Sequence, residues 1–404
     1  MKICHVAVIY LPGNLPGCSK YAQDISTGFI ERGHSITILT SRAVTGRGWV
    51  DPLFGQYSSK QEETINGVRV KRLKARWQIT LSMHLLRKAA NGFLPRSMGN
   101  ILSLFSAGPY LSSLDKEFRE EGYEIIHVIA FPFGLVRLVW KACKSLGIPY
   151  VCTPLIHFED PRHENPLLWK ALQDAAAVIA CSNYERAGMI TRGISPSKIH
   201  LVPMGINLDE WQGVDGKRFR ERHRLEGKKM ILFAGTKAYD KGALHLLQAV
   251  EDLSPKVKDL AFVSIGLPTR EWKRKKGTVH HGNLLDLGYV SNEEKKEAFE
   301  ACDLFAMPSR YDSFGIAYLE AWGCGKPVIG AKVGAIPEII EDGKDGLLVE
   351  FGNVDQLAAS IRYLLDHPVL CREMGERGKE KVARELNWRK NLPLIEQVYE
   401  QARS

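Results

Sequence analysis

Short apolar segments alternate with amphipathic stretches along the chain, which is the pattern of a parallel α/β sheet. The first segment, residues 6–10, predicts a strand that leads through a Pro/Gly-rich turn into a helix near residues 20–32, and Gly33 is placed to cap that helix. Five further strands are expected before residue 205, at residues 35–40, 125–130, 150–153, 178–181 and 200–203.

A second series begins at residues 229–235, an apolar strand that runs into a glycine and then into a helix from Gly242. It continues with strands expected at residues 260–266, 303–307 and 327–330. We therefore expect an α/β fold of two doubly wound, Rossmann-like domains joined near residues 205–213. Ligands bind at the carboxyl ends of the strands in such sheets, and here two sets of strand ends can face one central cleft.

The composition is that of a soluble globular protein. The chain has 404 residues, of which 45% are hydrophobic and 25% charged, so a disordered, collagen-like or disulfide-scaffold protein is excluded. The eight cysteines form no Cys-x-x-Cys pair and show no zinc spacing, so we expect reduced thiols, no metal site and a cytoplasmic location. The first ten residues predict a strand and no signal peptide.

The net charge of +9 lies entirely in the first half of the chain, where 24 basic and 15 acidic residues precede position 201. No Asp or Glu occurs within residues 64–114. The cations of this window are Arg69, Lys71, Arg72, Lys74, Arg76, Arg87, Lys88 and Arg96, and the bulky apolar residues between them include Trp77, Leu85, Leu86 and Phe93.

Cations that alternate with bulky apolar side chains suit the headgroup layer of an anionic membrane, so residues 64–114 are a candidate membrane-contacting surface. A solvated basic face beside buried apolar positions is the alternative interpretation. Nucleic acid is not expected as a partner, because no binding motif accompanies the charge. A run of four cations at residues 273–276 is expected to form an exposed loop.

The chain contains no P-loop, no Gly-x-Gly-x-x-Gly fingerprint and no Asp-x-Asp pair. A metal-held diphosphate usually needs closely spaced carboxylates. If a diphosphate binds here, lysine or arginine side chains and helix N-termini must therefore balance its charge.

Two segments could do so. Residues 235–242 leave a strand and enter a helix, and they carry two ammonium groups, Lys237 and Lys241, beside free backbone N–H donors. Residues 308–321 follow a second strand with a loop that contains Asp312 and a helix that begins near Gly315. Glu320 follows Asp312 by eight positions among apolar neighbours, where a buried carboxylate needs partners such as polyol hydroxyls. The alternative is that Asp312 is a helix-terminal acid and Glu320 a solvated side chain.

Together these segments resemble the retaining glycosyltransferases of the GT-B fold in family four (glycosyl transferases group 1), whose motif is Glu-x7-Glu. The resemblance extends over almost the whole chain. Its other landmarks are residues 32–34, 177–182, 202–207, 325–330, 334–338 and 342–349. It implies an acceptor-side domain at residues 1–205, a donor-binding domain at residues 206–385 and a C-terminal helix at residues 386–404 that crosses back to the first domain.

By position, the resemblance implies that Lys241 neutralises the diphosphate leaving group with help from Lys237. Asp312 would contact hydroxyls of the transferred sugar, and Glu320 would bind the ribose hydroxyls. The segment implied to hold sugar and phosphate comprises Ser313, Phe314, Gly315, Ile316 and Ala317.

The resemblance also implies that Gly235 and Thr236 take part in donor binding and that Val290 lies near the nucleobase. Gly17 matches a glycine of an N-terminal loop that approaches the phosphates. His157 resembles a histidine near the acceptor and the reacting carbon, which makes it a catalytic candidate.

The sequence departs from the family pattern at three positions. Asp312 stands where the motif has glutamate, Thr236 where an arginine is usual, and Pro16 where the loop normally has a first glycine. Because Lys241 and Glu320 are retained, we expect activity to survive all three departures.

The resemblance implies transfer from a nucleotide-diphosphate sugar to a hydroxyl acceptor with retention, without a cofactor or a metal. Asp312 is assigned to the sugar hydroxyls, so no second carboxylate remains as a nucleophile, and front-face attack with the departing diphosphate as base fits better. The acceptor is expected to be a glycan, or a membrane glycolipid or lipid-linked saccharide. A catalytically decayed binding protein docked on membranes and a sugar-nucleotide epimerase are the alternatives.

Overall fold

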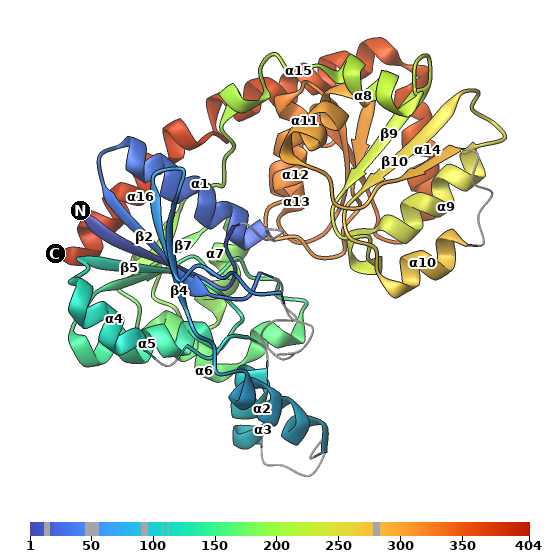
Figure 1. Ribbon diagram of the computed structural model, residues 1–404. Helices are drawn as coiled ribbons and strands as arrows, with labels where there is room; N and C mark the ends of the chain where they lie inside the picture. The colour runs from blue at the N-terminus through green and yellow to red at the C-terminus, as the bar shows by residue number, and fades with distance from the viewer. Residues whose placement is uncertain (12–16, 45–55, 90–95, 107, 112, 278–282) are drawn as a thin grey trace. The chain divides into compact units, whose positions relative to one another are not determined.

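The structure, a computed structural model, describes residues 1–11, 17–44, 56–89, 96–106, 108–111, 113–277 and 283–404 (Figure 1). It contains two compact units. The first consists of Met1–Pro203 together with Trp388–Ser404, and the second consists of Met204–Asn387. The C-terminal helix is therefore part of the first unit, although the second unit precedes it in the chain.

The first unit is built on an eight-stranded sheet in the order β3-β4-β2-β1-β5-β6-β7-β8, in which only the β3–β4 pair is antiparallel. Its strands are β1 (Lys2–Ala7), β2 (Ser35–Ser41), β3 (Glu62–Ile65), β4 (Val68–Leu73), β5 (Ile125–Ile129), β6 (Tyr150–Cys152), β7 (Ala177–Ala180) and β8 (Ile199–Leu201). Its helices are α1 (Gly17–Glu31), α2 (Trp77–Ala89), α3 (Arg96–Ser106), α4 (Leu114–Glu121), α5 (Leu135–Leu146), α6 (Pro166–Gln173), α7 (Asn183–Thr191) and α16 (Trp388–Arg403).

The second unit is built on a six-stranded parallel sheet in the order β11-β10-β9-β12-β13-β14. Its strands are β9 (Lys229–Ala234), β10 (Leu260–Ile265), β11 (Leu284–Asp286), β12 (Leu304–Ala306), β13 (Val328–Ala331) and β14 (Gly346–Val349). Its helices are α8 (Gly216–His223), α9 (Ala243–Leu253), α10 (Arg270–Lys276), α11 (Asn292–Ala301), α12 (Ile316–Gly323), α13 (Ile336–Ile339), α14 (Val354–Asp366) and α15 (Pro368–Arg384). Both units are thus Rossmann-like, as expected.

The strand pleat of the first sheet separates two kinds of core. Successive side chains of a strand point to opposite faces. Cys4 and Val6 of β1 and Val128 of β5 belong to an apolar cluster with residues of α4 and α5, such as Phe118. His5 of β1 and His127 of β5 lie on the other face, where His5 contacts Ser26 of α1 and both histidines contact Tyr399 of α16.

A continuous chain of hydrogen bonds joins α16 to the face of the sheet that carries His5 and His127. The Ser26 hydroxyl donates to the Ala22 carbonyl, so it accepts from His5 Nδ1 at 2.7 Å. The Tyr399 hydroxyl then donates to His5 Nε2 at 3.0 Å and accepts from His127 Nδ1 at 2.6 Å. His127 Nε2 in turn accepts from the Thr153 hydroxyl at 2.7 Å. Each ring both donates and accepts, so both imidazoles must be neutral.

Several predicted elements differ from the observed ones. The first strand ends at Ala7 instead of residue 10, and the sequence pattern did not indicate β3, β4, β11 or β14. The four cations at residues 273–276 end helix α10 instead of forming a loop. That helix forms because Thr269 caps its N-terminus, Trp272 is fully buried, and cations suit a helix C-terminus. The predicted turn before α1 lies mostly outside the described residues.

We expect Tyr399→Phe to lower the free energy of unfolding by about 1–3 kcal/mol, because it leaves two buried imidazole nitrogens without their partner. Urea denaturation of the full chain followed by fluorescence measures this. Tyr363→Phe is the matched control, since Tyr363 is 48% exposed on α14 and its loss should change stability by less than about 0.5 kcal/mol. Equal effects of the two substitutions would contradict the bridging role.

Acidification is expected to destabilise the first unit. Burial lowers the pKa of His5 and of His163 to about 3 and lowers that of His127. Histidines of the unfolded chain titrate near 6.5, so above that pH the neutral histidines make their full contribution to the free energy of unfolding. It is lost as the pH falls from about 6.5 towards 3, because only the unfolded chain takes up the protons.

Burial raises the pKa of Glu185 to about 7, and this carboxyl opposes the trend with one proton. Because three histidines take up protons on unfolding and only one carboxyl releases one, we expect the free energy of unfolding to fall by about 2–3 kcal/mol per pH unit below pH 6. Urea midpoints measured between pH 7.5 and pH 5.5 test this. Midpoints that stay constant or rise on acidification would show that the histidines are not held neutral.

Candidate active site

The second sheet has its topological switch point between β9 and β12. The chain proceeds from β9 outward to β10 and β11, and then returns to the other side of β9 with β12. Loops that leave the carboxyl ends of such neighbouring strands diverge to opposite faces and leave a crevice where ligands bind. Here these loops are residues 235–242 and 307–315, the two segments singled out from the sequence.

Glycine at two positions allows the backbone at these strand ends to approach closely. Gly242 has φ 71°, and a Cβ atom there would lie 2.2 Å from the Pro308 carbonyl oxygen. Gly266, at the end of β10, has φ 126°, and its Cβ would lie 2.0 Å from the Gly235 oxygen. Any side chain at Gly242 would push the loop that carries Lys241 away from the loop after β12.

Lys241 and Asp312 meet across these two loops. The Lys241 ammonium lies 3.0 Å from Asp312 Oδ2 and donates to the Tyr311 carbonyl at 3.2 Å. The Arg310 amide also donates to the Asp240 carbonyl at 2.7 Å, which joins the loop backbones. About a third of the Lys241 side chain is exposed, at 32%, so the ammonium remains accessible to a ligand.

Helix α12 begins directly beside this ion pair. Asp312 Oδ1 accepts from the Phe314 amide at 3.4 Å, and Gly315 occupies the N-cap position with φ 86° and no side chain to cap the helix. The first N–H groups of a helix have no intrahelical acceptor, so those near Ile316 and Ala317 carry a partial positive charge. A cation and a helix N-terminus therefore converge at the switch point, which suits an anion.

Glu320 lies one turn into α12 and is 6% exposed. Its Oε1 accepts from the Lys295 ammonium of α11 at 2.6 Å. Lys295 also lies over the Trp211 ring, 6.0 Å from its centroid. The sequence analysis predicted that Glu320 needs a partner but missed Lys295, because the two residues are 25 positions apart and no local pattern links them.

Comparison with known proteins agrees with this arrangement. The family described as glycosyl transferases group 1 matches residues 215–381, and glycosyltransferase family 4 matches residues 17–210. An uncharacterized glycosyltransferase of Methanocaldococcus jannaschii is 33% identical over 291 residues, which cover 70% of this chain and 76% of that protein. The chain belongs to the group 1, family 4 glycosyltransferases.

Solved structures show that the fold of this glycosyltransferase is GT-B. Sucrose-phosphate synthase from Thermosynechococcus elongatus superposes with a TM-score of 0.76 at 19% identity, over 99% of this chain and 98% of that one. HepE from Anabaena, in complex with UDP-glucose, superposes with a TM-score of 0.74 at 16% identity, with the same coverage. The protein is therefore a transferase of class EC 2.4, and the epimerase alternative is set aside.

Lys237 is held by groups of its own unit. Its side chain is buried, and its ammonium donates to Asp286 and to the Leu287 carbonyl. Although burial alone raises the pKa of Asp286, hydrogen bonds from Lys237, Lys276 and Trp272 lower it to about 2. Lys237 thus neutralises a carboxylate at the end of β11, and this geometry does not favour the predicted contact with phosphate.

The other donor-side candidates lie near the same strand ends. Thr236 is exposed beside Gly235, and Ser313 is half-buried in the loop before α12. Val290 is half-buried after β11, next to Tyr289, which is 60% exposed. Their roles in donor binding stay predictions.

Gly17 and His157 belong to the first unit. Gly17 is the first residue of α1, and the departure at Pro16 lies outside the described residues. His157 lies in the loop after β6, where its amide donates to His163 Nδ1 at 3.0 Å. The central cleft and the meeting of His157 with the donor residues stay predictions.

A buried carboxylate that the sequence analysis did not single out shapes the His157 loop. Glu185 of α7 is 1% exposed, and it accepts from the Ile156 amide at 2.7 Å and from the Cys181 amide at 2.8 Å. The neighbouring Leu155 has φ 54°, a conformation that a branched side chain rarely adopts. Glu185 therefore stabilises the strained backbone just before His157.

The sequence analysis also predicted that the enzyme has no metal site. Within the residues that the structure describes, no group of three or more His, Cys, Asp or Glu side chains could hold a metal ion.

We expect Lys295→Met to lower the free energy of unfolding of the second unit by about 1–3 kcal/mol, because it leaves the Glu320 carboxylate buried without its partner. Adding Glu320→Gln should recover part of the loss, and a double-mutant cycle in urea measures the coupling. Lys296→Met is the matched control on the same helix, since its partner Glu210 is 46% exposed. Equal losses at both lysines would contradict a specific role for Lys295.

Proposed function

We propose that this glycosyltransferase moves a sugar from a nucleotide-diphosphate sugar to a hydroxyl acceptor with retention at the anomeric carbon and without a metal. The observation that carries the proposal is the ion pair of Lys241 and Asp312 beside the uncapped start of α12. The structurally similar HepE of Anabaena was solved in complex with UDP-glucose, which supports a nucleotide sugar as donor.

In this proposal the donor's diphosphate lies between the Lys241 ammonium and the first N–H groups of α12. Both are aimed at the place where negative charge develops as the leaving group departs, so they stabilise the transition state more than the ground state. They supply positive charge at the position where other enzymes place a metal ion, which supports metal independence.

Asp312 is proposed to bind hydroxyls of the transferred sugar. Its Oδ1 and Oδ2 are already oriented by the Phe314 amide and by Lys241, so the carboxylate is positioned before the donor arrives. A pre-oriented acceptor of hydrogen bonds loses little conformational entropy on binding. Because Asp312 is committed in this way, front-face attack with the diphosphate as base is the proposed mechanism.

Glu320 is proposed to bind the ribose hydroxyls. Lys295 occupies one carboxylate oxygen, Oε1, which leaves Oε2 as the acceptor for the diol. Lys295 is then a positioning residue for Glu320. His157 is proposed to act near the acceptor, on a loop stabilised by Glu185. The acceptor itself is proposed to be a glycan or a membrane glycolipid in cell-surface glycan synthesis.

We expect Lys241→Met and Glu320→Ala each to lower the rate of transfer about 100-fold, because one removes the charge on the leaving group and the other removes the ribose contact. Nucleotide release from UDP-, GDP-, ADP- and TDP-sugars, assayed with and without EDTA, measures the rate and identifies the base. Lys344→Met, at an exposed lysine of the same unit, is the control and should keep the wild-type rate.

Wild-type rates in both site variants would reject the assignment of the site. Loss of activity in EDTA that is restored by a divalent cation would reject metal independence alone. Proton NMR of the product separates retention from inversion at the anomeric carbon.

A further inference from the structure

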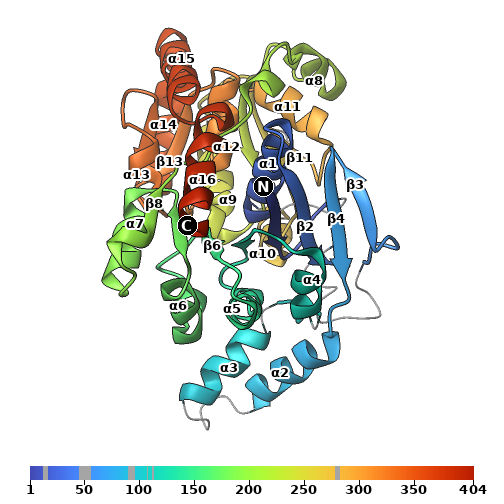
Figure 2. The same cartoon turned by 90° about the vertical axis from the view of Figure 1, so that its left-hand side faces the viewer.

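Helices α2 and α3 form a hairpin at the edge of the first unit. In both views they lie side by side, and α3 lies next to α6 (Figures 1 and 2). At the base of the hairpin the Arg76 amide donates to the Tyr110 carbonyl at 2.9 Å, and along α3 Asn165 Nδ2 donates to the Asn100 carbonyl at 2.8 Å. The hairpin is thus a fixed part of the unit.

The hairpin exposes large apolar side chains. Leu85 and Leu86 of α2 are 56% and 52% exposed, and Met98 and Ile101 of α3 are 50% and 42% exposed. On α3 the neighbouring Leu102 and Leu104 are buried against the rest of the unit. These helices therefore carry apolar residues on the buried side and also on the side that faces solvent, where nothing in the chain's described residues covers them.

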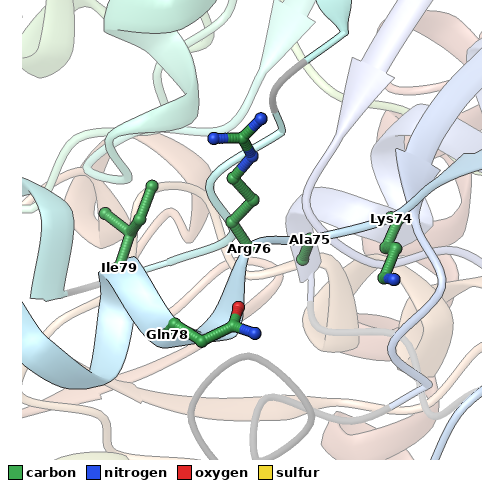
Figure 3. A pocket seen from close by; sticks show the side chains of 5 residues that line it. All are labelled: Lys74, Ala75, Arg76, Gln78 and Ile79. Atoms are coloured by element: carbon green, nitrogen blue, oxygen red, sulfur yellow. The ribbon is translucent and has the colours of Figure 1, made fainter.

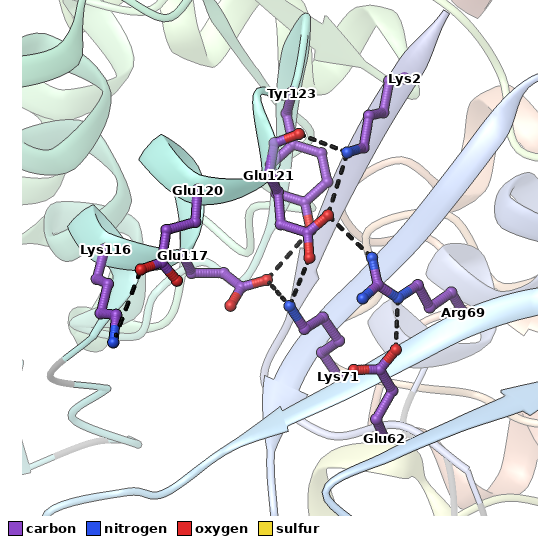
Figure 4. A network of polar contacts seen from close by, with 9 residues as sticks. All are labelled: Lys2, Glu62, Arg69, Lys71, Lys116, Glu117, Glu120, Glu121 and Tyr123. Atoms are coloured by element: carbon purple, nitrogen blue, oxygen red, sulfur yellow. Dashed lines mark hydrogen bonds and ion pairs between the residues drawn. The ribbon is translucent and has the colours of Figure 1, made fainter.

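The cations of β4 are not part of this surface, although the sequence places them in the same acid-free window. Figure 4 shows Arg69 and Lys71 paired with carboxylates of β3 and α4. Hydrogen bonds from Lys71, Arg69 and Lys2 lower the pKa of Glu121 to about 2. Arg72 is likewise buried against Glu63, at 2.8 Å. The predicted membrane surface therefore does not extend over all of residues 64–114.

The cations beyond β4 differ. Lys74, Arg76 and Arg87 are exposed, and among the described residues none of the ion pairs involves them. Lys74 and Arg76 line an open cavity of about 560 Å³ together with Gln78 and Ile79 (Figure 3). The described lining residues include no carboxylate, and Figure 3 shows the charged ends of Arg76 and Lys74 directed to different sides of the backbone that leads into α2.

We propose that the hairpin docks this enzyme on an anionic membrane. Leu85, Leu86, Met98 and Ile101 enter the headgroup layer, and the exposed Lys74 and Arg76 at the base of α2 each bind headgroup phosphates. This inference rests on the proposed function, because docking on a membrane would bring the enzyme to the proposed glycolipid acceptor. No helix within the described residues is long and apolar enough to span a bilayer.

Charge complementarity selects the membrane over a protein partner. The surface offers exposed aliphatic side chains and the exposed cations Lys74, Arg76 and Arg87, which join no ion pair among the described residues, whereas protein interfaces are depleted in lysine. Lipid headgroups present a uniform layer of phosphates above an apolar interior, which matches both components at once.

The test is co-sedimentation of the full chain with vesicles of phosphatidylcholine alone or mixed with phosphatidylglycerol. We expect binding to the mixed vesicles only, weakened by salt. Leu85→Ser/Leu86→Ser and Lys74→Gln/Arg76→Gln should each weaken binding about tenfold or more, because one removes apolar contact and the other two cations.

Matched controls lie elsewhere on the chain. Leu267→Ser/Val369→Ser removes apolar residues that are 51% and 58% exposed, and Lys116→Gln/Lys344→Gln removes lysines whose side chains are 73% and 64% exposed. Both control proteins should bind like the wild type. Equal losses in the controls, or no binding by the wild type, would overturn the proposal.

Donor binding, measured by calorimetry on the same proteins, separates this proposal from the proposed function. Donor binding without vesicle binding would reject the docking surface and leave the transferase assignment intact. Vesicle binding without donor binding would support the docking surface and reject the assignment of the donor site. Binding to an acidic protein but not to the mixed vesicles would also overturn the proposal.

Discussion

The first unit depends on a hydrogen-bond chain that ties together two distant parts of the sequence. Residues 1–203 form its sheet, but the chain leaves for the second unit and returns only at Trp388. Tyr399 of α16 then bridges His5 and His127, one on each of the central strands β1 and β5. Its hydroxyl has one proton and must both donate and accept, so both imidazoles stay neutral. The apolar packing of Phe29 on Tyr399 gives α16 its affinity for the sheet, and the hydrogen bonds fix its register.

In the second unit, the order of the strands in the sheet determines where the candidate site lies. Because β9 and β12 are neighbours whose connections run in opposite directions, their two loops must diverge above the sheet. Close approach of Gly242 to Pro308 then brings Lys241 to the carboxylate of Asp312. The ion pair is accordingly a consequence of the strand order and of one glycine.

This difference explains what could be predicted from the sequence. The buried strands and the segments around Lys241 and Asp312 were predictable, because apolar runs followed by glycine and polar residues mark strand ends. β4 was missed because its buried face ends in a charged residue, Arg72, and its other face carries Arg69 and Lys71, which leaves little apolar alternation in six residues. The direction of the Lys237 side chain and the partner of Glu320 were not predictable, since both depend on residues from other elements that meet only in the folded unit.

Charge patterns are subject to the same limit, and the hairpin shows why. A run of cations in the sequence says nothing about carboxylates that fold against it, and α4 supplies Glu117 and Glu121 to β4 in this way. That compensation ends at Lys74, and the hairpin that follows exposes both apolar and basic side chains. A protein that only needed solubility would not place four exposed aliphatic residues beside uncompensated cations, because such a patch promotes association. An exposed apolar patch must stay small if the protein is to remain dissolved, and a small patch combined with cations gives the reversible membrane binding that is proposed here.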